Sequence, residues 1–180
     1  RTVITGPAGL AKQFDSLDRM DRTHHQAVVA AAVAIVQMDA DFSHQPRYLP
    51  TLLHALENAD VAIGSRYVDG GGIETWGLLR RGVSYLGNAY AREFLGVPYR
   101  DLTAGFVGFR RHVLEAIDLD DIPSDGYGFQ LELKFRAHRR GFSIVEVPIV
   151  FFDRVVGNSK LSKKTIPEAV WRVAQLRLKE

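Results

Sequence analysis

Apolar residues recur along the chain at two spacings, one typical of strands and one of helices. The short apolar runs Ala34–Met38 and Val61–Ile63 predict two buried strands, and the first ends at a pair of acidic residues. Between these runs, leucines at the i, i+3, i+4 and i+7 positions predict one face of a helix, with Pro46 suited to its start. These leucines are Leu49, Leu52, Leu53 and Leu56.

The second half of the chain continues the alternation of helix and strand. A helix is expected from Leu78 to Leu95, closed by Gly96 and Pro98. Its apolar stripe, which we expect to face the core, is Leu79, Val83, Leu86, Tyr90 and Phe94. The further elements expected are a strand near 105–109, helices near 112–117 and 128–140, and a strand over 143–151.

This order predicts an α/β fold with a mostly parallel central sheet and helices on both faces. In such sheets the ligand site lies at the carboxyl ends of the strands. Residues 1–34 carry little signal, and because the chain begins with Arg1 we expect it to be a fragment of a longer protein. We therefore expect a divergent or truncated part at 1–34, a catalytic core at 35–165 and a basic amphipathic helix at 166–180.

Composition narrows the classes of protein that need considering. A chain of 180 residues with 46% hydrophobic and 24% charged residues fits one globular domain. The pI near 9.0 and the basic residues after Arg136 indicate an anionic partner such as a phosphate or a membrane surface. The absence of cysteine excludes disulfides and thiolate metal sites and suits a reducing compartment, so we expect a cytoplasmic protein. The apolar run Ala27–Val36 is too short to cross a bilayer.

Asp39 and Asp41 lie two residues apart at the end of the first strand. In extended chain both carboxylates point to one side and can share a hard divalent cation, Mg²⁺ or Mn²⁺. Such an ion could bridge the phosphates of a nucleotide diphosphate and offset the charge of its departure. Taken alone, an Asp-x-Asp pair is more often a solvated acidic turn after a strand.

Several cations and one carboxylate complete the set of candidate residues. Arg66 follows the second strand and could hold a phosphate or form a salt bridge. Arg154 and Lys160 flank a glycine-bearing loop that could wrap an anion or could be a solvated basic turn. Glu132 lies within a predicted helix and is either a general base or an exposed charge.

Taken together, these segments resemble the dolichol-phosphate (polyprenol-phosphate) mannosyltransferases of glycosyltransferase family 2. The match runs from about Ile35 to Ser162. The motifs that carry it are Val36-Gln-Met-Asp39-Ala-Asp41-Phe-Ser-His44-Gln-Pro46, Ile63-Gly-Ser-Arg66-Tyr, Asp101-Leu-Thr-Ala-Gly105-Phe, Gly126-Tyr-Gly-Phe-Gln130-Leu-Glu132, Glu146-Val-Pro148-Ile and Arg154-Val-Val-Gly157-Asn-Ser159-Lys160-Leu-Ser162.

The resemblance implies a GT-A (Rossmann-like) fold, a divalent metal on Asp39 and Asp41, and a GDP-mannose donor used with inversion. It also implies that Arg66 faces the acceptor phosphate and that Arg154 and Lys160 enclose the donor diphosphate. The catalytic residues are then Asp41, Arg66 and Glu132, the last of these orienting the sugar. A phosphate acceptor is already anionic at neutral pH, so no catalytic base is needed.

The sequence departs from the family's pattern in two places. Val107 stands where the family has an arginine, and we expect Arg110, together with Ser159, to supply acceptor-phosphate contacts; Arg111 is an alternative to Arg110. The family's opening strand and its segment for the nucleotide base and ribose are not recognisable in residues 1–34. On this basis, a chain limited to this sequence should bind the nucleotide-sugar poorly.

The expected partners are the nucleotide-sugar, a polyprenyl or dolichyl phosphate and the cytoplasmic face of a membrane, with no nucleic acid. A membrane-spanning partner subunit or fused domain is left open. The C-terminal stripe from Ile166 to Leu176 could lie on the membrane or pack on the domain. A UDP-glucose donor and a non-catalytic membrane-binding module are the alternative functions, whereas the residues after Asp41 fit a phosphatase of the Asp-x-Asp type badly.

Overall fold

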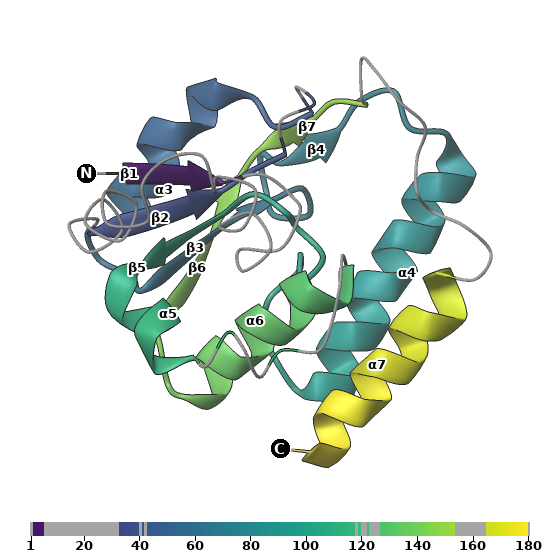
Figure 1. Ribbon diagram of the computed structural model, residues 1–180. Coiled ribbons are helices and arrows are strands. Elements are labelled where there is room, and N and C mark those ends of the chain that lie inside the picture. The colour runs from purple at the N-terminus through teal and green to yellow at the C-terminus, as the bar shows by residue number, and fades with distance from the viewer. Residues whose placement is uncertain are drawn as a thin grey trace, which may run out of the picture.

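Five strands form the central sheet, in the spatial order β1-β2-β5-β3-β6 (Figure 1). Their bounds are Thr2–Thr5 (β1), Ala34–Gln37 (β2), Val61–Ser65 (β3), Val107–Arg110 (β5) and Ile144–Pro148 (β6). The structure is a computed structural model and describes residues 2–5, 33–39, 41, 43–117, 119, 122, 127–153 and 165–179.

The strands of the sheet do not all run in the same direction. β1 pairs with β2 in parallel, and so does β3 with β6, whereas β5 lies between β2 and β3 and is antiparallel to both. β1, β2, β3 and β6 therefore point the same way, and the mostly parallel sheet predicted from the sequence is confirmed.

Helices cover both faces of this sheet, as the alternation of elements predicts. Their bounds are Leu49–Ala55 (α3, preceded by a 3₁₀ turn at Pro46–Tyr48), Leu78–Leu95 (α4), Arg111–Ala116 (α5), Tyr127–Arg139 (α6) and Thr165–Lys179 (α7). Because side chains alternate across a strand, neighbouring residues serve opposite faces. Ile35 packs towards α5 and α6, and Val36 packs towards α3.

Helices α4 and α7 lie side by side at the edge of the molecule (Figure 1). Val173 and Leu176 of α7 are buried in a cluster that includes Ala91 and Leu95 of α4 and reaches α6. Part of the C-terminal stripe therefore packs on the domain. Gly96 ends α4 in the left-handed conformation, φ +68°, as its position in the sequence predicts.

Only part of the apolar stripe predicted to bury α4 faces protein: Tyr90 packs on the cluster shared with α7. Leu79 is 85% exposed and Leu86 is 67% exposed, whereas the buried residues of this helix are Asn88, Ala91 and Leu95. Small and polar residues along the buried side let α4 approach the loop that precedes β5. The most apolar side of α4 faces outward.

Three short strands differ from the sequence prediction. β1 lies within the N-terminal stretch, where we expected little regular structure. The single strand expected over 143–151 is divided into β6 and β7 (Val150–Phe151), and β7 pairs with β4 (Gly72–Ile73) in a separate two-stranded sheet. The chain leaves the central sheet at Ile149, whose N–H donates to the carbonyl oxygen of Ser65.

Candidate functional site

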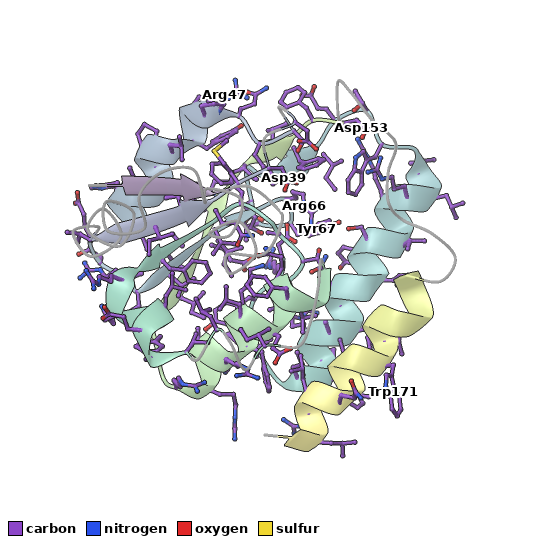
Figure 2. All side chains as sticks on the ribbon, in the orientation of Figure 1. Asp39, Arg47, Arg66, Tyr67, Asp153 and Trp171 are labelled. Carbon is purple, nitrogen blue, oxygen red and sulfur yellow. The ribbon has the colours of Figure 1, made fainter. Side chains whose placement is uncertain are left out.

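Three segments meet at the carboxyl edge of the central sheet. Asp39 follows β2, Arg66 follows β3, and residues 101–105 lead into β5, whose reversed direction brings its start to this edge. We call residues 101–105 the hub loop. Figure 2 shows Asp39, Arg66 and Tyr67 near one another at this edge. The site therefore lies where the strand order places ligand sites in α/β folds.

Asp39 is held by a buried histidine. The Nδ1 atom of His44 accepts a hydrogen bond from the Asp39 backbone N–H at 2.9 Å, which places the ring proton on Nε2. The His44 ring stacks on Phe106, with 5.2 Å between the ring centroids. A β-carbon at Gly105 would lie 3.8 Å from an Asp39 carboxylate oxygen, so the hub loop lies directly against Asp39.

Asp41 is ordered by its own turn, and the pair of aspartates fits a hard divalent cation. The Oδ1 atom of Asp41 accepts hydrogen bonds from the Ser43 N–H at 3.1 Å and from the Ser43 hydroxyl at 2.5 Å. Within the described residues no group of three or more His, Cys, Asp or Glu could hold a metal. Mg²⁺ typically takes one or two carboxylates from the protein and completes its shell with water and substrate phosphates. Asp39 and Asp41 would supply these two carboxylates.

Arg66 is nearly buried and forms an ion pair with a carboxylate of the hub loop. Its Nε and Nη2 atoms donate to the two oxygens of Asp101, each at 2.7 Å, and Nη2 also donates to the Thr103 hydroxyl at 2.9 Å. Burial alone would raise the pKa of Asp101, but the charge and hydrogen bonds of Arg66 hold that pKa below its ordinary value. The phosphate contact predicted for Arg66 stays a prediction. In the structure, Asp101 and Thr103 hold the Arg66 guanidinium in one position at the edge of the site.

Aromatic rings surround the Arg66 guanidinium. Its Cζ atom lies 5.4 Å from the ring centroid of Tyr67 and 5.6 Å from those of Trp76 and Phe151. Arg80, at the start of α4, stacks on Trp76 with Cζ 3.9 Å from the ring centroid. This aromatic wall joins the Arg66 side of the site to the exposed start of α4.

The hub loop is anchored by several side chains that sequence reasoning did not assign to the site. Asn88 accepts a hydrogen bond from the Thr103 N–H and donates to the Thr103 hydroxyl. Glu146 accepts a hydrogen bond from the Asp101 N–H, and Lys134 donates to two carbonyl groups of the loop. The motif Asp101-Leu-Thr-Ala-Gly105 was visible in the sequence, but its partners are far away along the chain.

Glu132 forms an ion pair with Arg136 of the same helix. Its carboxylate is almost fully buried and accepts hydrogen bonds from Arg136, one turn further along α6, at 2.7 and 3.1 Å. Each residue turns a helix by about 100°, so Glu132 projects about 200° away from Lys134, which faces the hub loop. Glu132 is therefore not an exposed helix charge, and the role in orienting the sugar that the resemblance implies for it stays a prediction.

The prediction that Arg110 contacts the acceptor phosphate is wrong. Arg110 pairs with Ala34 at the start of β2, whereas Asp39 follows the end of that strand. Its guanidinium donates to the carbonyl oxygens of Leu56 and Glu57. Because β5 is antiparallel to its neighbours, its last residues lie at the opposite edge of the sheet from the site.

Arg111, the alternative substitute for the arginine that Val107 replaces, does not lie at the site either. Arg111 begins α5 at the same far edge as the end of β5 and pairs with Glu115. Val107 is fully buried between Gln37 and Ile63. The other predicted basic and hydroxyl contacts, Arg154, Ser159 and Lys160, lie outside the described residues.

The mostly parallel sheet with helices on both faces and the Asp-x-Asp pair at its carboxyl edge agree with the GT-A fold predicted from the sequence. The family described as glycosyl transferase family 2 matches residues 25–118. The chain belongs to this family, and the family predicted from the sequence motifs is confirmed.

Two curated bacterial relatives are similar over 78% of the chain. The undecaprenyl-phosphate mannosyltransferase of Micrococcus luteus is 49% identical over 141 residues, which cover 58% of that protein. The polyprenol monophosphomannose synthase of Mycolicibacterium smegmatis is 50% identical over 142 residues, or 54% of that protein. The chain thus spans a little over half the length of these relatives.

Solved structures with similar folds include glucosyl-3-phosphoglycerate synthase from Mycobacterium tuberculosis. Its complex with Mn²⁺, UDP and glucosyl-3-phosphoglycerate is 19% identical, with a TM-score of 0.54 over 84% of this chain and 51% of that chain. Its complex with Mn²⁺ and UDP-glucose is 20% identical, with a TM-score of 0.53 over the same shares. At these identities the likeness shows the fold alone.

Proposed function

We propose that this chain is catalytic-domain sequence of an enzyme that transfers mannose from GDP-mannose to a polyprenyl phosphate with inversion, giving polyprenyl-phosphate β-mannose. The names of the two relatives, at 49% and 50% identity, support the sugar and the acceptor class. The structural observation that carries the proposal is the hub loop: its Gly105 lies against Asp39, and its Asp101 holds Arg66. One loop thereby contacts both Asp39, which would bind the metal, and Arg66, which would bind the acceptor phosphate.

The chemistry that these residues serve is a single in-line displacement. An anionic oxygen of the acceptor phosphate forms a bond to the anomeric carbon, and the bond from that carbon to the donor diphosphate breaks, its electron pair leaving with the diphosphate. Asp39 and Asp41 would hold a Mg²⁺ or Mn²⁺ ion, which offsets the charge on the departing diphosphate. Arg66 would orient the acceptor phosphate through its planar guanidinium. No side chain has to remove a proton from the acceptor.

The proposal keeps the roles that the family resemblance assigns outside the described residues. Arg154 and Lys160 would enclose the donor diphosphate, and Ser159 would add a contact to the acceptor phosphate. Arg66→Ala would then weaken acceptor use more than donor binding, and Lys160→Ala the reverse.

The test of this function is transfer of labelled sugar by the full-length protein. The assay offers GDP-mannose or UDP-glucose, with Mg²⁺ or Mn²⁺, to vesicles that contain undecaprenyl phosphate. The expected product is a mannosyl lipid phosphate formed from GDP-mannose and absent when undecaprenol without phosphate replaces the acceptor. Transfer from UDP-glucose alone would identify a glucosyltransferase, and no transfer from either donor would favour a non-catalytic binding module.

We also propose that the outward side of α4 contacts the cytoplasmic face of the membrane that carries the acceptor. Leu78, Leu79 and Leu86 are exposed on this helix, and Trp171 is exposed on the neighbouring α7. The helix begins two residues after Trp76, which contacts the Arg66 seat, so the apolar side is continuous with the proposed acceptor site. A lipid-linked phosphate has to be reached at a bilayer surface, and apolar side chains beside the site would hold it there. Among the described helices, none is long and apolar enough to span a bilayer.

Replacing two of these leucines should weaken membrane binding without unfolding the protein. In the double variant Leu79→Asn, Leu86→Asn, flotation with phosphatidylcholine–phosphatidylglycerol vesicles is expected to fall by about tenfold or more, because each buried leucine contributes about 1.5–3 kcal/mol. Val145→Asn, at an exposed apolar residue of β6, is the matched control and should leave flotation unchanged. Equal flotation of the double variant and the wild type would exclude the α4 surface.

A further inference from the structure

Lys134 is a fully buried lysine on α6. Its Nζ atom donates hydrogen bonds to the carbonyl oxygens of Leu102 at 2.8 Å and Ala104 at 2.6 Å. Both acceptors belong to the hub loop, some 30 residues away along the chain. Lys134 Nζ therefore binds the hub loop at two backbone positions.

The two carbonyl groups that bind Lys134 lie between the two working ends of the hub loop. On one side, Asp101 and Thr103 hold the Arg66 guanidinium. On the other side, Gly105 lies against Asp39. A shift of Leu102 and Ala104 would move Arg66 relative to Asp39, so the anchor at Lys134 controls the separation of the two proposed substrate seats.

Burying a lysine side chain is unfavourable in free energy. Removing an ammonium group from water costs several kcal/mol unless it is well paired, and an apolar side chain of similar volume would pack without that cost. Burial, together with the smaller effect of the Arg66 charge, lowers the pKa of Lys134 to about 7 against the opposing charges of Asp101 and Glu146. A neutral amine still has two N–H donors, so both carbonyl bonds persist in either protonation state.

The charged groups around Lys134 come from several elements. Arg66 follows β3, Asp101 belongs to the hub loop and Glu146 lies on β6. On α6 itself, the Glu132–Arg136 ion pair lies on a different side of the helix. The two hydrogen bonds of Nζ go to the backbone carbonyl groups of Leu102 and Ala104, whose positions follow the path of the loop.

We propose that Lys134 is a positioning residue for the transfer reaction: its two bonds to the hub loop set the distance between the donor seat at Asp39 and the acceptor seat at Arg66. This inference rests on the proposed function for its kinetic consequence. Its structural consequence, an ordered hub loop, can be measured without turnover.

The test compares Lys134→Met with the wild type in the full-length protein. Methionine fills similar space without a donor, so the Leu102 and Ala104 carbonyl groups lose this partner and the Tm should fall, while kcat falls about 10²-fold as the reacting groups are misplaced by about 1 Å. Amide hydrogen exchange at residues 102–105 should quicken, and that of β3 should not. Arg139→Met, an exposed position on α6, is the control and should change neither kcat nor exchange.

Lys134→Gln keeps two N–H donors on a shorter side chain, so an activity between those of the wild type and Lys134→Met is expected. It also provides a second measurement if Lys134→Met does not fold. Wild-type kcat together with wild-type exchange in a folded Lys134→Met protein would overturn the positioning role. A wild-type enzyme that transfers no sugar would instead refute the proposed function, and the exchange measurement would still decide whether Lys134 orders the loop.

Discussion

Asp39→Asn and Asp41→Asn are each expected to lower kcat by about 10²- to 10³-fold while leaving the fold intact. Each change removes a negative oxygen ligand from the proposed cation site, and stabilising the charge of a leaving group is typically worth several kcal/mol. Asp39 is partly exposed and its backbone N–H bonds to His44, and asparagine keeps the size of the side chain, so we expect the fold to tolerate the change. The measurement is initial velocity with GDP-mannose and undecaprenyl phosphate over a range of Mn²⁺ concentrations.

The control for this prediction is Asp60→Asn. Asp60 precedes β3 at the opposite edge of the sheet and binds Ser143 and His112, so its change should affect stability and not kcat. Calorimetric titration of Mn²⁺ in the presence of GDP should show weaker binding for both site variants. Activity that survives EDTA and both substitutions would rule out the metal role.

Asp101→Ala is expected to lower the free energy of unfolding by about 3–5 kcal/mol. The change leaves Arg66 buried without its carboxylate partner, and breaking one half of a buried ion pair is costly. Urea unfolding of the variant and the wild type measures the difference. The exposed pair of Arg92 and Glu93 is the control, since Glu93→Ala should cost less than about 1 kcal/mol.

Two further measurements separate the stability of this pair from its function. The double variant Arg66→Met, Asp101→Leu should recover most of the lost stability, because apolar groups can replace a buried ion pair, but it should not use the acceptor. The pKa of Asp101 is lowered in the folded protein, so the pair's contribution is present at neutral pH and is lost as the pH falls below about 4. A loss of stability in Asp101→Ala that does not shrink in acid would contradict this assignment.

The sequence predicted the elements and the edge of the site, because both depend on local pattern. β2 ends two residues before Asp39 and β3 ends directly before Arg66, and carboxyl ends of co-directional strands share an edge. The reversed direction of β5 has no local signal, and for that reason Arg110 was assigned to the wrong end of the sheet.

The side chains that hold the site could not be read from spacing. Asp101 binds Arg66 across 35 positions, and Lys134 reaches the hub loop across about 30. The prediction that the apolar stripe of α4 faces the core failed in part for a related reason. Periodicity identifies an apolar face, but it does not say whether protein or another apolar phase covers it, and here Leu79 and Leu86 face outward.

The position of β5 has a consequence for the order in which this chain can fold during synthesis. Among the described strands, β2 and β3 have no ladder with each other, and β5 joins them. A nascent chain released only as far as residue 106 can pair β1 with β2, but it leaves β3 without a neighbour, since β6 also comes later. The sheet becomes continuous only after 107–110 insert between two strands made earlier, a non-local step of the kind that slows folding. Chains ending before β5 should therefore be the ones that proteases and chaperones recognise.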